Sequence, residues 1–164
     1  AAFAVERVAI IDFDVHHGQG TQAVVEPEPT LFYASTHQYP LYPGTGFPRE
    51  RGIAGNVVNV PLAAGSGSAE FRTAWSERIL PALDGFAPEL VIVSAGFDGH
   101  RRDPLAQLDI ETEDFVWLTE ELLAIAGRHA GGRLVSVLEG GYDLAALAES
   151  VATHVRTLMA ADAA

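Results

Sequence analysis

The order of short apolar runs along the chain is the feature that most restricts its fold. Five runs rich in β-branched and aromatic residues lie at 8–11, 30–33, 57–60, 90–93 and 134–138. Segments with apolar residues at helical spacing lie at 69–86, 113–128 and 144–159. Parallel strands need crossover connections and are buried on both faces. The pattern therefore predicts an α/β fold, a parallel sheet flanked by helices.

Size and composition favour one folded domain. The 164 residues are 48% hydrophobic and 20% charged, close to an average soluble chain. No stretch reaches the roughly 20 apolar residues that cross a bilayer, so we expect a soluble, cytoplasmic protein without a membrane partner. The formal net charge of -12 argues against nucleic acid and favours cationic ligands. Since there is no cysteine, a metal site must use imidazole and carboxylate ligands.

The first run ends in a polar cluster that includes Asp12, Asp14 and His16. Because side chains alternate along an extended segment, these three are predicted to project to one face. They lie at the carboxyl end of the strand, where open α/β sheets bind ligands, and they suit a cation. The alternative is a turn or capping cluster that leads into a helix at Gly20.

The fourth run is followed directly by Asp98, which is predicted to lie at the same end of the sheet. Together with Asp14 and His16 it would form a three-ligand site that leaves a position open, an arrangement that suits zinc. The alternative is that Asp98 and Asp103 pair with the neighbouring arginines in a surface turn. That alternative suits Asp103 better than Asp98, because Asp98 immediately follows the apolar run.

The fifth run is followed by two glycines, Gly140 and Gly141, and then by Tyr142. The glycines give the backbone conformational freedom just before a helix, so the phenol is able to swing toward the same site. A phenol beside a metal can donate a hydrogen bond to the oxyanion of a tetrahedral intermediate. The alternative for Tyr142 is a packing residue.

One loop and several other residues can also be interpreted from the sequence. The stretch from Gln38 to Gly55 is rich in proline, glycine and tyrosine and has no periodicity, which indicates a functional loop. We expect His37 and His100 to have structural roles near the strand ends. We expect His129 and His154 at surface positions on helices, and Trp75 and Trp117 at core positions.

Four segments, DFDVHHGQGT, STHQYPLYPGTG, SAGFDGHRRDPL and LEGGYDL, occur in this order. Together they resemble the histone deacetylase family, especially its class II and bacterial members. The resemblance covers nearly all of residues 1–164, but only the C-terminal half of the family's catalytic domain. It implies a partial domain of the three-layer arginase/deacetylase type. It also implies that Asp14, His16 and Asp98 bind zinc and that Tyr142 polarises the acetyl carbonyl.

The resemblance implies further binding residues. A potassium ion would be held, mainly by backbone oxygens, at Asp12, Asp14, His16, Ser35 and Thr36. The acyl-lysine tunnel would have Tyr42 as an aromatic wall and Leu105 at its rim, with Gly140 and Gly141 beside them. Apolar Leu105 offers nothing to a second ammonium, which favours an acetylated lysine peptide over an acetylated polyamine or other small amine.

One feature of the family is absent. Its members carry a His-His pair upstream that serves as general base and acid, and no such pair precedes Asp12. Asp12, counted with Tyr142 as catalytic, would orient one of those histidines. We therefore expect low activity from this chain alone. The exposed edge of a partial sheet would favour homo-oligomers.

Two other functions stay open. The first is a pseudoenzyme or acyl-lysine-binding module, which the missing histidine pair supports. The second is an arginase-like ureohydrolase with two manganese ions. That reading needs carboxylates where this chain has Gly18 and His100.

Overall fold

A five-stranded parallel sheet organises the protein. The computed structural model describes residues 5–161. The strands run in the order β3-β2-β1-β4-β5. Their bounds are β1 (Val8–Asp12), β2 (Leu31–Gln38), β3 (Val57–Leu62), β4 (Leu90–Ala95) and β5 (Leu134–Leu138). All four strand pairs are parallel, so the predicted sheet is confirmed.

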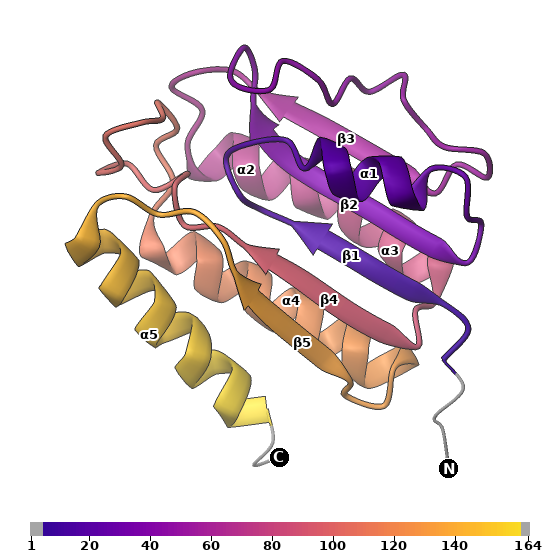
Figure 1. The fold of residues 1–164 in the computed structure, drawn as a ribbon. Helices are drawn as coiled ribbons and strands as arrows, with labels where there is room; N and C mark the ends of the chain where they lie inside the picture. Colours follow the sequence, from indigo (N-terminus) through magenta and orange to yellow (C-terminus); the bar gives the residue numbers. More distant parts are fainter. Residues whose placement is uncertain (1–4, 162–164) are drawn as a thin grey trace.

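The helices divide unequally between the two faces of the sheet (Figure 1). They are α1 (Gln19–Val25), α2 (Ser68–Ala74), the π-helix η1 (Trp75–Ile79), α3 (Leu80–Phe86), α4 (Thr112–His129) and α5 (Leu144–Ala161). The helices from α2 to α5 lie on one side, which we call the closed face, and α1 lies on the other, the open face. Of the described helices, none is long and apolar enough to cross a membrane.

The closed face holds the main hydrophobic core. On β4, the side chains of Val91, Val93 and Ala95 are buried and point to this face. Beyond the strand ends, Phe97 packs edge-on against the ring of Phe115, with ring centroids 5.1 Å apart. This packing fixes the segment that follows β4, where the candidate ligand Asp98 lies.

The predicted helix at 69–86 is interrupted by one π-helical stretch, η1. Its widened register places the N–H of Leu80 on the carbonyl of Trp75. The following residue, Pro81, has no N–H and its ring would crowd the carbonyl four residues earlier in a regular helix. The wider turn accommodates this proline while Trp75 and Ile79 both stay buried.

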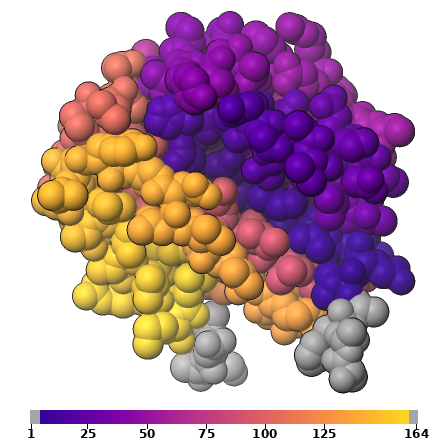
Figure 2. Space-filling view, in the orientation of Figure 1, coloured from indigo at the N-terminus to yellow at the C-terminus, as the bar shows by residue number. Residues whose placement is uncertain are grey.

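The open face is apolar but only partly covered. Val135 and Val137 of β5 lie in register with Ile92 and Ser94 of β4, so all four share this face. Val135 is 52% exposed and Val137 is 46% exposed. Within residues 5–161, β5 pairs with β4 alone and is an edge strand. Figure 2 shows orange residues of this part of the chain at the surface.

Candidate metal centre

Three side chains meet beyond the carboxyl ends of β1 and β4. Asp14, His16 and Asp98 each offer one ligand atom, and these atoms lie within 4.8 Å of one another. The Nδ1 atom of His16 is 3.0 Å from Oδ1 of Asp14 and 3.2 Å from Oδ2 of Asp98. The structure thus brings together the three ligands that the sequence predicted.

The backbone reaches this arrangement by turns and not by strand alternation. β1 ends at Asp12, and two successive side chains then accept backbone N–H groups two residues on. The backbone N–H of Asp14 donates to Oδ1 of Asp12 at 3.1 Å, and the backbone N–H of His16 donates to Oδ1 of Asp14 at 2.8 Å. The prediction that alternation alone aligns the three side chains was therefore wrong. All three nevertheless line one hollow, because aspartate turns of this kind re-aim the chain.

The electrostatics of the cluster favour a bound cation. Asp98 is fully buried, and burial together with the charge of Asp14 raises the pKa of Asp98 to about 7. Its Oδ1 accepts the N–H of Val15 at 2.8 Å. Its Oδ2 is within ion-pair distance of His16 but receives no hydrogen bond from any described residue. A buried carboxylate oxygen without a donor is a natural metal ligand.

Two glycines make the space that the carboxylates occupy. A Cβ atom on Gly140 would collide with the carboxylates of Asp98 and Asp14, and a Cβ on Gly96 would collide with Asp14. The N–H of Gly140 also donates to Oδ2 of Asp14 at 2.9 Å. Two carboxylates and one imidazole, packed this closely, fit a divalent ion such as zinc with one position open.

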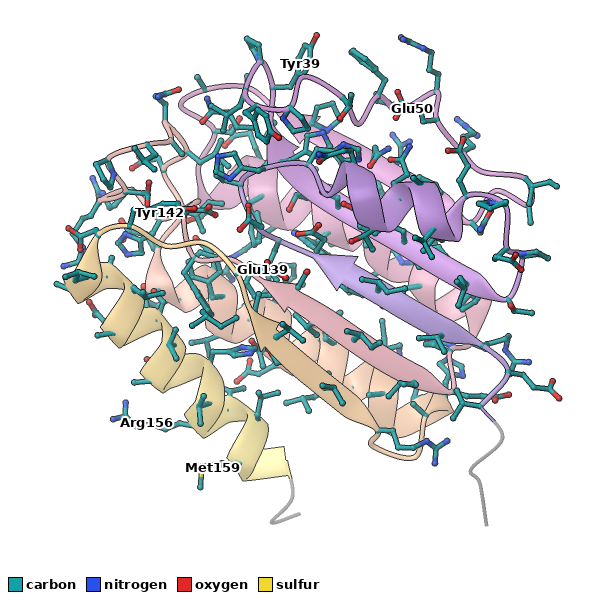
Figure 3. The ribbon with its side chains drawn as sticks, in the orientation of Figure 1. Tyr39, Glu50, Glu139, Tyr142, Arg156 and Met159 are labelled. Atoms are coloured by element: carbon teal, nitrogen blue, oxygen red, sulfur yellow. The ribbon has the colours of Figure 1, made fainter. Side chains whose placement is uncertain are left out.

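The hollow beside the cluster has a volume of about 490 Å³. Tyr142, on the segment between β5 and α5 (Figure 3), lines it together with Glu139. Burial, followed by the negative charges of Asp98 and Asp14, raises the pKa of the Tyr142 phenol. The phenol therefore keeps its proton at neutral pH and is able to donate a hydrogen bond. The complete lining is Asp12, Asp14, His16, His17, Gly18, Gln19, Thr21, Tyr42, Ser94, Leu138, Glu139, Gly140 and Tyr142.

Asp12 lies at the floor of this region on the open face. It is 3% exposed, and burial is the main cause that raises its pKa to about 8. The phenol of Tyr33 donates a hydrogen bond to Oδ2 of Asp12 at 2.9 Å, which acts in the opposite direction. A carboxyl group with this pKa is largely protonated at neutral pH.

The predicted tunnel residues are only partly gathered. Tyr42 is 72% exposed and its ring lies edge-on to His16, with centroids 6.4 Å apart. Gly140 also lines the hollow, whereas Leu105 and Gly141 do not. Leu105 is 54% exposed on the neighbouring loop. Tyr42 thus lines the hollow, and its role as a tunnel wall stays a prediction, as does a rim at Leu105.

The predicted potassium residues lie on adjacent strands. Ser35 and Thr36 of β2 are buried, and Ser35 is in register with Asp12 of β1. The side chain of Ser35 is within hydrogen-bond distance of Nδ1 of His37, at 3.0 Å. Potassium binding stays a prediction.

Two surface assignments from the sequence were wrong. His154 is 5% exposed, because α5 packs it against α4 and β5, where it contacts Thr119 at 2.7 Å and Ser136 at 2.9 Å. Asp103 is 8% exposed and does not pair with an arginine. It accepts the backbone N–H groups of Leu105 at 2.9 Å and Tyr142 at 2.8 Å.

Other side chains without a chemical assignment support the fold. His129 is half-buried and contacts Asp84 at 2.9 Å. Trp75 is fully buried, as predicted, but Trp117 is only half-buried beneath the guanidinium group of Arg72. His100 is buried, and its Nδ1 accepts a backbone N–H. The structural role expected for His100 is consistent with these contacts.

A buried histidine pair anchors the loop that carries Tyr42. The rings of His17 and His37 lie 4.8 Å apart, and they contact Thr45 at 2.7 Å and the carbonyl of Gly46 at 3.0 Å, respectively. Burial, then the neighbouring His17, lowers the pKa of His37 to about 4. His37 therefore has the expected structural role. His17 was not predicted to have one, although the consecutive histidines were a visible signal.

Comparisons with known proteins agree with this geometry. The family model of the histone deacetylase domain matches residues 1–158. Histone deacetylase 14, chloroplastic, of Arabidopsis thaliana is 43% identical over 161 residues, 96% of this chain and 38% of the relative. Polyamine deacetylase HDAC10 of Mus musculus is 40% identical over 166 residues, 96% of this chain and 24% of the relative.

A solved structure gives the same result. The crystal structure of the HDA15 HD domain superposes with a TM-score of 0.89 at 36% identity, covering 97% of this chain and 46% of that one. The fold is that of the deacetylase class of proteins. The chain belongs to the histone deacetylase family. It spans less than half the length of each of these relatives.

Proposed function

We propose that this chain carries the metal-binding part of a zinc-dependent amidohydrolase that removes acetyl groups from acetyl-lysine or a related acylated amine. The observation that carries this proposal is the close approach of Asp14, His16 and Asp98, whose ligand atoms lie within 4.8 Å, beside the phenol of Tyr142. When bound, zinc supplies Lewis-acid activation of the amide carbonyl and of a water molecule.

The residues of the chain divide the remaining work. Asp14, His16 and Asp98 hold the metal, and the buried carboxylates favour it electrostatically. Tyr142 keeps its proton and donates a hydrogen bond to the developing oxyanion. Tyr42 forms an apolar wall for the extended acyl-lysine side chain. Apolar Leu105 favours an acetylated lysine peptide, whereas one of the relatives is named a polyamine deacetylase.

The general base is the missing element of this chain. No histidine precedes Asp12 in the sequence, and Asp12 itself holds a proton near neutral pH. Loss of a general base costs about a hundred- to ten-thousand-fold in rate. We therefore propose that this chain alone hydrolyses acetyl-lysine far more slowly than a full-length relative. The potassium site at Asp12, Asp14, His16, Ser35 and Thr36, and a cytoplasmic location, belong to the same proposal.

The chain contains no lysine, because all ten of its Lys-or-Arg residues are arginine. This makes the activity easy to measure with a reagent for amines. With no lysine amine in the chain, an amine-reactive dye detects the lysine side chain released from an acetylated peptide with a low background. A zinc-dependent rate close to that of a full-length relative would contradict the proposal of low activity. Tight binding of the acetylated peptide without turnover would favour the acyl-lysine-binding alternative instead.

The arginase-like alternative is poorly supported by the described residues. A second metal would need a carboxylate near Asp98 in place of His100. The imidazole of His100 instead accepts the N–H of Arg102 at 3.1 Å and lies 3.5 Å from the hydroxyl of Thr112. The cluster of residues that could hold a metal contains three ligands and suits one ion.

Zinc content tests the proposed function directly. We expect one zinc ion per chain by elemental analysis, and none in an Asp14→Ala, Asp98→Ala double variant. Zinc at a hundred times its dissociation constant should also raise the free energy of unfolding by about 2.7 kcal/mol in the parent chain only. A folded parent chain that binds no zinc would contradict the proposal.

A matched control separates metal binding from charge. The Asp84→Ala, Asp109→Ala double variant removes two carboxylates from surface ion pairs with Arg128 and Arg101. We expect it to bind zinc with the parent stoichiometry. Circular dichroism of both double variants establishes that zinc loss is not a consequence of unfolding.

A further inference from the structure

The segment that carries Tyr142 is attached to the rest of the protein at two points. At Gly140, the N–H donates to Oδ2 of Asp14 at 2.9 Å and the carbonyl accepts the N–H of Phe97 at 2.7 Å. At Tyr142, the backbone N–H donates to Oδ2 of Asp103 at 2.8 Å. Both attachments use a carboxylate from another loop.

Between these points lies a glycine, the residue whose backbone is least restricted in rotation. Gly141 has a φ angle of +145°, a conformation that residues with side chains rarely adopt. Without the bond to Asp103, rotation about Gly141 would carry the phenol of Tyr142 away from the metal ligands. The position of the phenol therefore depends on what holds the backbone of Tyr142.

Asp103 is well suited to hold it. Its side chain is buried, and its two oxygens accept different backbone donors, Oδ1 from Leu105 and Oδ2 from Tyr142. Hydrogen bonds to an ionised carboxylate are about twice as strong as bonds between neutral groups. One side chain thus joins the loop that bears Leu105 to the segment that bears Tyr142.

The loop of Asp103 is itself fixed. The N–H of Asp103 donates to the carbonyl of buried His100 at 2.8 Å. The next residue back, Arg102, donates its own N–H to Nδ1 of His100 and pairs through its side chain with Glu149 of α5 at 2.8 Å. Asp103 is therefore held relative to both the sheet and α5.

We propose that Asp103 is a positioning residue that sets the place of Tyr142 relative to Asp14, His16 and Asp98. It makes the loop of Leu105 and the segment of Tyr142 move as one unit. The inference rests on the proposed function for the importance of Tyr142. Its test, however, reads the position of the tyrosine and requires neither metal nor turnover.

The test uses an Asp103→Asn variant. Asparagine keeps the local turn, because its side-chain oxygen is able to accept the N–H of Leu105 two residues on. Its amide group then faces the N–H of Tyr142 and cannot accept it. The Asp109→Asn variant is the matched control, since Asp109 lies on the same loop and its side chain forms an exposed ion pair with Arg101.

The readout is fluorine NMR of chains labelled with 3-fluorotyrosine. The chain has four tyrosines, and a Tyr142→Phe variant identifies the resonance of Tyr142. In Asp103→Asn we expect this resonance to move toward that of free fluorotyrosine. We also expect hydrogen exchange at the Tyr142 amide to become at least about tenfold faster. The resonance of buried Tyr33 should stay in place.

Three results would overturn the proposal. They are an unchanged Tyr142 resonance and exchange rate in Asp103→Asn, an equal change in Asp109→Asn, or a shift of Tyr33 that shows a general effect on the fold. Zinc content measured on the same samples keeps the two proposals apart. A parent chain without zinc would contradict the proposed function and leave the tyrosine result intact.

Discussion

The two faces of the sheet differ in how completely they are covered, although the same strands form both. On the closed face, Val91 and Val93 of β4 are fully buried against helices. On the open face, Val135 and Val137 of β5 are about half exposed, although their sequence is equally apolar. Strands of parallel sheets are apolar on both sides because helices normally cover both. The strand sequences thus suit a second covering layer, of which α1 forms only a part.

The largest expected effect contrasts a core position with an open-face position. Phe115 is fully buried among the rings of Phe13, Phe71 and Phe97, so Phe115→Ala should lower the free energy of unfolding by about 3–5 kcal/mol. Val137→Ala should cost less than about 1 kcal/mol, since half of that side chain is already in water. Urea unfolding measures both. Equal losses would mean that the open face is as well packed as the closed one.

An intermediate effect should come from His154, which α5 buries against α4 and β5 on the closed face of the sheet. The hydroxyl of Thr119 donates to the carbonyl of Phe115, so its oxygen accepts a hydrogen bond from Nδ1 of His154. Burial lowers the pKa of His154 below its usual 6.5. Because the unfolded chain binds this proton more readily, stability from His154 is complete above pH 6.5 and falls as the pH drops below it.

Urea unfolding at pH 8 and pH 5 measures this contribution. His154→Asn retains a donor for Thr119 and removes the titrating group. We expect the parent chain to lose more stability on acidification than the variant, by at most about 1.4 kcal/mol per pH unit. Parallel losses in the two proteins would show that His154 is not the group responsible.

The smallest effect on stability should come from the exposed β5 side chains of the open face. A Val135→Thr, Val137→Thr variant keeps the β-branched shape, and we expect its free energy of unfolding to stay within about 0.5 kcal/mol of the parent. Self-association measured by sedimentation velocity should decrease, because exposed apolar side chains on the open face favour contact with a second copy. Unchanged association would place any oligomer contact elsewhere. Val93→Thr, its closed-face counterpart, should cost about 1–3 kcal/mol.

The sequence predicted the sheet well because its signals are local. Each of the five apolar runs became a strand, and the carboxyl ends of β1 and β4 brought Asp14, His16 and Asp98 together as expected. The parallel direction of the strands follows from the alternation of strands and helices. The position of a ligand at a strand end needs little more information than this.

The errors concern residues whose surroundings come from distant parts of the chain. His154 lies on a helix, and its burial depends on β5 and α4, which helical periodicity does not reveal. Asp103 is next to arginines in sequence but bonds to Tyr142, 39 residues away. The turn geometry after Asp12 likewise depends on side-chain to backbone bonds that a simple alternation ignores.

The absent side chain of Gly140 has a consequence for reading mutational data. An alanine at this position adds only one methyl group and removes no reactive atom, yet that methyl would occupy the room of the carboxylates of Asp14 and Asp98. A substitution screen would therefore score position 140 as intolerant, alongside residues that perform chemistry. Gly140 contributes the space that these carboxylates occupy. Such a position is recognised only when the neighbouring atoms, rather than its own, are considered.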